Sequence, residues 1–292
     1  MIKLLVTGTH GQTAQSLLRQ ARHHSGVAVE AIGRPEIDLE KPAVMAAAMA
    51  ARAPDIIVNA AAYTAVDRAE QEPALAYAVN RDGAADVARI AQRLGVPLIH
   101  LSTDYVYDGR KPSPYVETDA TGPLSVYGAS KLAGEQAVLD ACPQALILRT
   151  SWVYSPFGGN FVKTMLRIGA ERERVRVVDD QVGNPTSADD LADAILRIAP
   201  ALAGRSGVYH LAGSGHVSWC GFARHIFETS GKLGGPQPAV EAITTAEYPT
   251  AAKRPQRSWL AIDAFAQRFG FTLPDWQGSV ENVVGELLQE RP

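Results

Sequence analysis

Short apolar runs alternate with helix-forming stretches along the first half of the chain. The apolar runs are rich in valine, isoleucine and leucine, and most of them end in a glycine or a polar residue, as buried β-strands do. The stretches between them are alanine-rich or carry apolar residues at helical spacing. The strands are predicted at 2–7, 27–32, 55–61, 96–102 and 145–150, and the helices at 12–23, 42–52, 72–94 and 125–140.

This regular alternation of strand and helix predicts an α/β fold with a doubly wound parallel sheet of the Rossmann type. Right-handed crossovers then place helices on both faces of the sheet. We expect a sheet domain over residues 1–151, rejoined by segments around 175–200, and mostly a smaller α/β lobe over residues 152–292. In the less regular second half, helices are predicted at 159–168, 188–198 and 280–288, and strands at 175–178 and 208–212.

Composition narrows the class of protein without changing this fold. Of the 292 residues, 46% are hydrophobic and 20% are charged, which is ordinary for a globular protein. The net charge of −3 includes no basic block that would follow a phosphate backbone, so we expect no nucleic-acid partner. No apolar run is long enough to span a bilayer, and residues 1–8 lack the pattern of a secretory signal. Cys142 and Cys220 are far apart in the sequence. We expect both to be reduced thiols, as is usual in the cytoplasm.

A glycine-rich turn follows the first predicted strand and opens the first predicted helix. It reads Thr-Gly-Thr-His-Gly-Gln-Thr-Ala over residues 7–14. Gly8 permits the tight turn, Gly11 lets the backbone approach a pyrophosphate, and Ala14 is small enough for close helix–strand packing. The N-terminus of the helix suits the negative charge of that group. Glycine turns are common on their own, but in this strand–turn–helix context the sequence predicts a dinucleotide site.

The end of the second strand indicates which dinucleotide is bound. An acidic residue there favours NAD, whereas an arginine can hold the 2′-phosphate of NADP. This chain has Arg34, whose planar guanidinium suits a phosphate; a solvated surface arginine is the alternative. We expect NADPH as the cofactor, with NADH as the second choice. Asp38 and Leu39 could meet the adenine, and the small residues 60–62 either admit the cofactor close to the backbone or form a tightly packed strand end.

Candidate catalytic residues lie at the carboxyl ends of successive predicted strands, where open α/β sheets bind ligands. Thr103 follows the fourth strand, and its hydroxyl could orient a substrate oxygen. Tyr127 and Lys131 are four residues apart on the next helix and so share one face. A free tyrosine has a pKa of about 10, and a neighbouring ammonium and a cationic nicotinamide ring should lower it. Lys131 could also hold the ribose hydroxyls. Such a pair is common by chance, so the combination of features carries the inference.

This combination resembles the extended short-chain dehydrogenase/reductase superfamily and, within it, the dTDP-4-dehydrorhamnose reductase family. The segments that carry the resemblance occur in order along nearly the whole chain. They are Asn-Ala-Ala-Ala-Tyr-Thr-Ala-Val-Asp at 59–67, Ser-Thr-Asp-Tyr-Val-Tyr-Asp-Gly at 102–109, Tyr-Gly-x-x-Lys-Leu-Ala-Gly-Glu at 127–135, Arg-Thr-Ser-Trp-Val-Tyr at 149–154 and Asp-Gln-x-Gly-x-Pro-Thr at 180–186.

The resemblance implies an activity and completes the set of site residues. The family reduces the C4 ketone of dTDP-6-deoxy-L-lyxo-4-hexulose (dTDP-4-dehydrorhamnose) with NAD(P)H and gives dTDP-L-rhamnose. By the resemblance Tyr127 is the general acid, with Lys131 as its partner and Thr103 beside them. From motif and resemblance together, the expected sugar-nucleotide contacts are Thr103, Asp104, Trp152 and Arg254, and the expected cofactor contacts are Gly8, His10, Gly11, Gln12, Arg34, Asp38, Leu39, Ala62, Tyr63, Thr64, Tyr127 and Lys131.

Some positions depart from the family pattern. Certain members hold Mg²⁺ at a dimer interface with acidic side chains; at one matching position this chain has Gln15, and the other matching region reads Ser-Ala-Asp-Asp at 187–190. We therefore expect no protein-held metal site, while a homodimer stays open. Trp219 and Trp259 could line the pocket or pack the second lobe.

Other functions fit parts of the pattern. A nucleotide-sugar 4,6-dehydratase or 4-epimerase of the same fold commonly has an acidic residue after the Thr-Asp pair, where this chain has Tyr105, so simple reduction is favoured. A non-catalytic regulatory subunit could keep the fold and bind NADP, but the complete set Thr103, Tyr127 and Lys131 argues against it. Reduction of another nucleotide-linked 4-ketosugar also stays open, because fold and motifs do not define the shape of the pocket.

Overall fold

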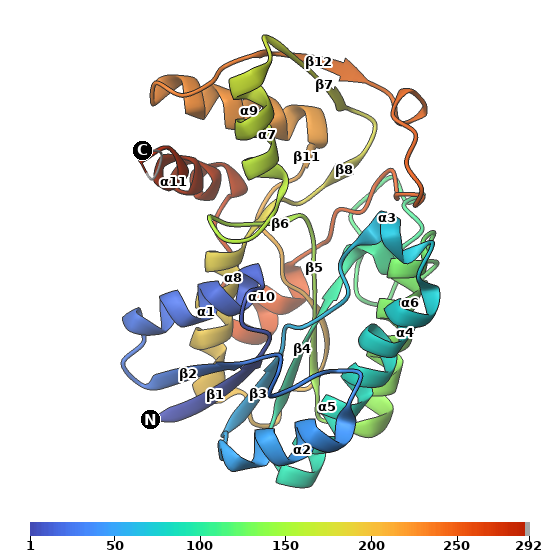
Figure 1. The fold of residues 1–292 in the computed structure, drawn as a ribbon, viewed down its shortest axis with the longest axis vertical. Helices are drawn as coiled ribbons and strands as arrows, with labels where there is room; N and C mark the ends of the chain where they lie inside the picture. The colour runs from blue at the N-terminus through green and yellow to red at the C-terminus, as the bar shows by residue number, and fades with distance from the viewer. Residues whose placement is uncertain (290–292) are drawn as a thin grey trace.

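A parallel β-sheet forms the lower part of the molecule in this computed structural model (Figure 1). Within residues 1–289, which the structure describes, its six strands are β1 (Ile2–Thr7), β2 (Val27–Ile32), β3 (Ile56–Asn59), β4 (Leu98–Thr103), β5 (Leu146–Thr150) and β10 (Gly207–His210). They lie in the order β10-β5-β4-β3-β1-β2, and every neighbouring pair is parallel. The direction of winding reverses between β1 and β3, as in a doubly wound sheet. The predicted fold class is confirmed.

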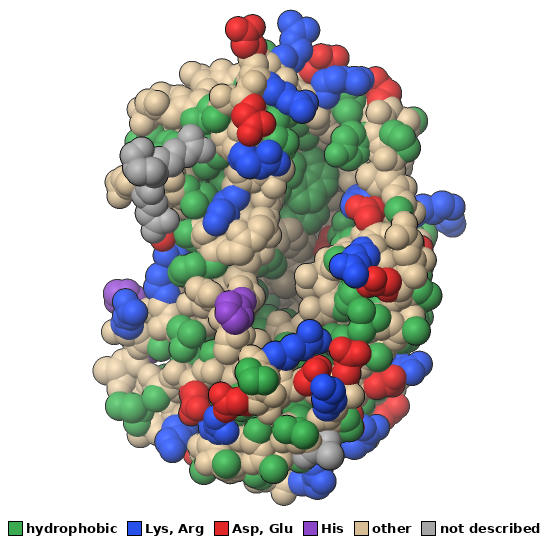
Figure 2. All heavy atoms as spheres, viewed as in Figure 1, with side chains coloured by type: hydrophobic (Ala, Val, Ile, Leu, Met, Phe, Trp, Pro, Cys, Tyr) green, Lys and Arg blue, Asp and Glu red, His purple; other side chains and the backbone are tan. Residues whose placement is uncertain are grey.

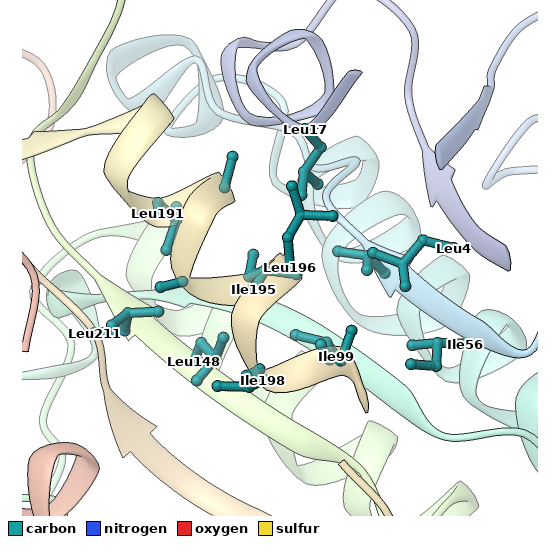
Figure 3. Packing of buried hydrophobic residues seen from close by; sticks show 14 of the residues in the cluster. Leu4, Leu17, Ile56, Ile99, Leu148, Leu191, Ile195, Leu196, Ile198 and Leu211 are labelled. Atoms are coloured by element: carbon teal, nitrogen blue, oxygen red, sulfur yellow. The ribbon is translucent and has the colours of Figure 1, made fainter. Parts of the chain in front are cut away.

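Two hydrophobic cores, one on each face, hold this sheet between helices. The covering helices are α1 (Gln12–Gln20), α2 (Pro42–Ala51), α5 (Ala84–Leu94), α6 (Val126–Ala141), α8 (Ala188–Ile198) and α10 (Asp263–Phe269). Successive side chains of a strand alternate between the cores: Leu4 packs with α1 and α8, and Leu5 packs with α2, α5 and α6. Figure 3 shows the first core, where Leu17 of α1 and Ile195 of α8 contact the strands.

The upper part of the molecule in Figure 1 is a smaller α/β assembly. Its elements are α7 (Phe161–Glu171), β7 (Arg174–Val178), α9 (Trp219–Lys232), β12 (Ala239–Ile243) and α11 (Trp276–Gln289). β7 pairs in parallel with β12, and the helices share a core that includes Phe222, Ile226 and Val280. Two short ladders pair β6 (Val153–Tyr154) with β9 (Thr186–Ser187) and β8 (Val182–Gly183) with β11 (Val217–Ser218).

The helix predicted over 72–94 is confirmed, and a π-helical interruption that the sequence did not indicate lies within it. It begins as α4 (Pro73–Tyr77), passes through a π-helical segment η2 (Ala78–Gly83) and continues as α5. A π-turn holds an extra residue, and within this one the Asn80 amide turns inward. It donates to the Tyr63 carbonyl and to Ser130 Oγ, both at 3.0 Å. The interruption therefore lies where this helix packs against α6.

The strand predicted over 55–61 is shorter than expected because Thr7 draws the chain out of the sheet. β3 ends at Asn59. Thr7 Oγ1 then accepts hydrogen bonds from the backbone N–H groups of Ala60 and Ala61, both at 3.1 Å. The segment that follows leaves the sheet and lies beside the cavity described below.

The second half holds further differences. The pattern after Gly231 does not predict β12 or α10, and α11 begins at Trp276, before the predicted position. Cys142 and Cys220 are both free and buried. None of the helices in the described range is long and apolar enough to cross a membrane. The remaining short elements are η1 (Ala21–His23), α3 (Val66–Ala69), η3 (Asp104–Val106), η4 (Ala199–Ala201) and η5 (Thr245–Glu247).

Candidate active site

A large open cavity lies above the carboxyl ends of the central strands. It measures about 1320 Å³ and is lined by residues at the ends of β1, β3, β4 and β5 and by residues of the upper part of the molecule. In Figure 2 the visible face is hollowed at this level, with apolar side chains above the hollow. The predicted site residues that line the cavity are Gly8, His10, Gly11, Gln12, Arg34, Asp38, Leu39, Ala62, Thr64, Thr103, Asp104, Tyr127, Lys131, Trp152 and Arg254.

The glycine-rich turn closes one end of the cavity. Gly8 has φ +93°, a conformation that residues with a Cβ rarely adopt. Gly11 is the N-cap of α1, and no side chain of the described residues caps that helix. Its first N–H groups and the positive end of its dipole are therefore left for another acceptor. This end of the cavity fits an anionic group such as a pyrophosphate.

Arg34 lies at the cavity edge with its guanidinium between two carboxylates. Its side chain is 69% exposed, Nη2 donates to Glu40 Oε2 at 3.2 Å, and Nε lies 3.5 Å from Asp38 Oδ1. Exposed ion pairs of this kind contribute little to stability, so a phosphate could replace them at small cost. A phosphate contact of Arg34 stays a prediction.

Among the predicted site residues, all of which lie in the described part of the chain, Tyr63 is the one that does not line the cavity. Its hydroxyl donates to Glu72 Oε2 at 2.7 Å, and its backbone N–H donates to Asn80 Oδ1 at 2.8 Å. Both polar groups are thus bonded within the protein, and the structure does not support a cofactor contact through them.

Helix α6 carries Tyr127 to the floor of the cavity. Ser125 caps the helix, since its Oγ accepts from the Gly128 N–H at 3.2 Å. Gly128 lies against the Tyr105 carbonyl, and a Cβ at this position would come within 2.3 Å of that oxygen. The glycine therefore lets α6 approach the end of β4, where the Thr103 hydroxyl bonds to the Tyr127 hydroxyl.

The Tyr127 hydroxyl is protonated at neutral pH. Burial raises its pKa to about 12, and the hydrogen bond between it and the Thr103 side chain offsets this only in part. The expected lowering by Lys131 is wrong for the protein alone, because the Lys131 ammonium donates instead to the Leu101 carbonyl at 2.6 Å. A neutral phenol is the form that can give up a proton. The site is therefore prepared to protonate a substrate oxygen.

Lys131 is the cation of the cavity floor, with only 3% of the residue exposed. Burial lowers the pKa of its ammonium to about 8, and the neighbouring Glu135 carboxylate opposes that shift. Lys131 is therefore mostly charged at pH 7 and loses its proton not far above it.

Asp104 is a buried carboxyl beside these groups. One oxygen accepts from Thr103 Oγ1 at 3.1 Å, and the other has no hydrogen-bond partner among the described residues. Burial raises the pKa of Asp104 to about 7, while the Ser258 and Thr103 hydroxyls lower it. A buried polar atom without a partner is costly, and here it lies in a residue that lines a ligand cavity.

The cavity lining also includes an aromatic wall and an ion-paired arginine. Trp152 and Trp219 stack with ring centroids 3.5 Å apart and 5° between their planes, and the Phe161 ring lies 4.5 Å from Trp219. Arg254 Nη2 donates to Asp67 Oδ2 at 2.6 Å. Apolar walls with a few placed charges are typical of sites for small organic ligands that also carry polar groups.

The chain matches a protein-family model along almost its whole length. That model, described as RmlD substrate binding domain, covers residues 2–289. A dTDP-4-dehydrorhamnose reductase of Sinorhizobium fredii is 50% identical over 294 residues, 99% of each chain. One of Escherichia coli K12 is 46% identical over 86% of each chain. The chain belongs to the dTDP-4-dehydrorhamnose reductase family.

A solved structure from the same family has the same fold. It is a Bacillus anthracis dTDP-4-dehydrorhamnose reductase in complex with NADP, 35% identical to this chain, with a TM-score of 0.92. The match covers 98% of this chain and 100% of that one. The resemblance drawn from the sequence motifs is therefore confirmed over the full fold.

The family motifs locate most of the cavity lining but not all of it. Asp67, Phe161 and Trp219 line the cavity and lie outside the predicted set. Asp67 ends the first family segment after the glycine turn, so its position could have indicated it. Trp219 had two open interpretations, and the structure assigns it to the pocket. Trp259 packs instead against His216, with ring centroids 3.8 Å apart.

The positions at which certain family members hold Mg²⁺ are engaged otherwise in this chain. Gln15 donates to a backbone carbonyl at 3.4 Å, Asp189 pairs with Arg19, and Asp190 accepts from Ser279. Over the described residues, no cluster of three or more histidine, cysteine, aspartate or glutamate side chains is placed to hold a metal ion. The absence of a protein-held metal stays a prediction.

Proposed function

We propose that this protein reduces the C4 ketone of dTDP-4-dehydrorhamnose to dTDP-L-rhamnose, with NADPH as the preferred cofactor and NADH as the second choice. One observation carries the proposal. Thr103, Tyr127 and Lys131 line a single cavity together with the glycine-rich turn and the stacked Trp152 and Trp219. The names of the full-length relatives support the choice of ketosugar.

The chain's own residues account for the proton half of the reaction. NADPH supplies a hydride to C4 when it is bound. Tyr127 protonates the substrate oxygen as negative charge develops on it, a contribution of roughly 10²–10⁴-fold in rate. Thr103 hydrogen-bonds the same oxygen and fixes its position. Lys131 stabilises the phenolate that Tyr127 becomes after giving up its proton, since opposite charges favour the ionised form.

The other site residues bind the two ligands. The glycine-rich turn and the N-terminus of α1 hold the pyrophosphate, and Arg34 contacts the 2′-phosphate. The adenine and riboses lie along the strand ends, and the sugar nucleotide lies between β4 and the aromatic wall. The remaining cofactor contacts are His10, Gln12, Asp38, Leu39, Ala62 and Thr64, and the remaining sugar-nucleotide contacts are Asp104, Trp152 and Arg254.

The two parts of the fold divide this work. Residues 1–151, with returning segments around 175–200, bind the dinucleotide, and residues 152–292 supply most of the sugar-nucleotide lobe. The net charge of −3 without a basic block supports an enzyme with no nucleic-acid partner, and the free thiols of Cys142 and Cys220 support a cytoplasmic one. A homodimer is the assembly to test first, by sedimentation velocity.

A nucleotide-absorbance assay tests the function. Purified protein, NADPH and enzymatically generated dTDP-4-keto sugar are mixed, and loss of the reduced nicotinamide is followed. We expect the wild type to consume NADPH and Tyr127→Phe to be slower by about 10²–10⁴-fold, because the variant has no phenolic proton to give.

Tyr248→Phe is the matched control, since it removes a hydroxyl from a side chain at the surface, 59% exposed. It should turn over like the wild type. If NADPH binds and none is consumed, a regulatory subunit or a reductase of another ketosugar replaces the proposal. Equal rates for Tyr127→Phe and the wild type would remove Tyr127 from the mechanism.

A further inference from the structure

A buried ion pair lies one helical turn beyond Lys131. Glu135, on α6, accepts two hydrogen bonds from Arg149 of β5, at 2.9 Å from Nε and 2.6 Å from Nη2. It also accepts the Ser102 hydroxyl of β4 at 2.5 Å. Glu135 is 3% exposed and Arg149 is 5% exposed, and neither lines the cavity.

The pair joins α6 and β4, which carry the candidate catalytic residues, to β5. Glu135 stands four residues after Lys131 and so lies on the same face of α6. Ser102 immediately precedes Thr103 at the end of β4. Arg149 is the second-last residue of β5, a few residues before Trp152. One carboxylate therefore ties helix α6 to both strand ends beside which the substrate would bind.

The far side of the pair is also held. Arg149 Nη1 donates to the Tyr107 hydroxyl at 2.7 Å, and that hydroxyl lies 2.7 Å from His210 Nε2. His210 Nδ1 lies 3.0 Å from the Ala261 carbonyl oxygen. Burial lowers the pKa of His210 to about 3, so the imidazole is neutral and the network holds Arg149 as its guanidinium.

Stability alone does not explain such a pair. Replacing a buried ion pair with apolar residues of similar volume is often neutral or stabilising, whereas removing one partner leaves an uncompensated charge. What an apolar pair could not supply is a negative charge near a buried ammonium. Glu135 opposes the effect of burial on Lys131, and the Lys131 ammonium otherwise bonds only a neutral carbonyl among the described partners.

We propose that Glu135 and Arg149 are a positioning pair that keeps Lys131 charged and fixes Thr103 in place without touching the substrate. The inference rests on the role proposed for Lys131. The positive charge of Arg149 weakens the electrostatic attraction of Glu135 for Lys131. The negative charge of Glu135 in turn offsets the repulsion between Arg149 and Lys131. Glu135 on α6 and His100 on β4 interact electrostatically with Lys131, and Arg149 on β5 is paired with Glu135. Tyr127 on α6 and Asp104 after β4 line the same cavity as Lys131.

The two charges predict opposite effects when each is removed. In Glu135→Gln, Lys131 faces an unpaired guanidinium, and the alkaline limb of the kcat/KM profile near pH 8 should move to lower pH by about one unit. In Arg149→Gln, an unpaired carboxylate faces Lys131, and the same limb should move to higher pH. If the pair had only a structural role, kcat would fall in both variants and the alkaline limb would stay at the same pH in both.

A second readout does not depend on turnover. The full-length protein is treated with an amine-acylating reagent from pH 6 to pH 10, and modification of the Lys131 peptide is measured by mass spectrometry. Its midpoint should shift with the same signs in the two variants. If no protein turns over the ketosugar but the midpoints shift, the proposed function fails while the pair stands. Midpoints that do not move, or that shift in the same direction in both variants, would overturn the role proposed for Glu135 and Arg149.

A third variant covers the case in which the charge variants do not fold, which thermal unfolding reports. Ser102→Ala removes one hydroxyl and no charge. We expect kcat to fall about 3- to 10-fold through misplacement of Thr103, with the alkaline limb and the KM for NADPH unchanged. An unchanged kcat overturns the positioning of Thr103. Glu241→Gln, on exposed β12, is the control for loss of a carboxylate and should match the wild type.

Discussion

At the scale of single residues, burial moves three titratable side chains on the cavity floor, those of Tyr127, Asp104 and Lys131, toward their neutral forms. The pKa of Tyr127 is raised to about 12 and that of Asp104 to about 7, whereas that of Lys131 is lowered to about 8. Near pH 7 the phenol therefore holds its proton, the ammonium is mostly charged, and the carboxyl is near its midpoint. This combination suits reduction, because the proton donor is loaded and the phenolate it leaves has a cation nearby.

Asp104 gives a prediction for stability. The pKa of about 7 in the folded protein lies above the ordinary value of 3.8, so between these values the folded state binds more protons than the unfolded state. Stability then falls as pH rises through this window. We expect urea unfolding to show the wild type losing stability between pH 4 and pH 8 in a step that Asp104→Asn lacks.

The control for this experiment is Asp140→Asn, an exposed position on α6. It should keep the pH dependence of the wild type. A step of the same size in Asp104→Asn and the wild type would show that another group titrates on unfolding.

At the scale of elements, α6 brings the site together through close contacts on two sides. Gly128 admits the Tyr105 carbonyl at one end of the helix, and Gly134 admits the Asn80 carbonyl of η2 on another side. A Cβ on Gly134 would come within 2.0 Å of that oxygen. The π-turn at Asn80 therefore fits against Gly134 of α6. This contact helps to set how deeply Tyr127 enters the cavity.

Gly134→Ala should destabilise the protein by about 1–3 kcal/mol, because backbone atoms must shift to admit the methyl group. Alanine is otherwise the better helix former by about 0.5–1 kcal/mol. Gly278→Ala, within α11 and with no atom near the added Cβ, is the matched control and should gain about that amount. Thermal unfolding of both variants measures the difference. A stabilised Gly134→Ala protein would contradict the close contact with Asn80.

At the scale of the whole molecule, the cavity is built from both halves of the chain. Gln12 beside the glycine-rich turn accepts from Ser155 at 2.9 Å and from Asn160 at 3.0 Å, and Asp67 holds Arg254. These contacts join segments more than a hundred positions apart. Cofactor binding in this cavity should therefore stabilise the whole fold rather than one turn.

NADPH at about 100 times its Kd should raise the free energy of unfolding by about 2.7 kcal/mol, because only the folded protein binds it. Differential scanning fluorimetry checks this. Arg34→Ala should weaken the effect of NADPH at the same concentration, with a Kd about tenfold higher or more, and leave the effect of NADH unchanged. Equal losses with both cofactors would assign Arg34 to the structure of the loop rather than to the 2′-phosphate.

The first half of the fold follows from local patterns. Strands such as β1, β2 and β5 are mostly apolar and end at a polar residue or before a glycine, so their ends are predicted closely. The interruption at Asn80 and the early end of β3 depend on side chains from other segments, Ser130 and Thr7, and no local pattern records them. In the second half, β12 and α10 lie among prolines and polar turns and are defined by their partners.

The sequence by itself determined the fold class, the family, the glycine-rich turn and the set Thr103, Tyr127 and Lys131, because strand runs and motif spacings are local properties of the chain. Only the tertiary structure decided that Trp219 stacks on Trp152 and that Glu135 pairs with Arg149. It also decided the direction of each pKa shift. Desolvation depends on atoms brought together from remote segments, and no stretch of sequence contains that information.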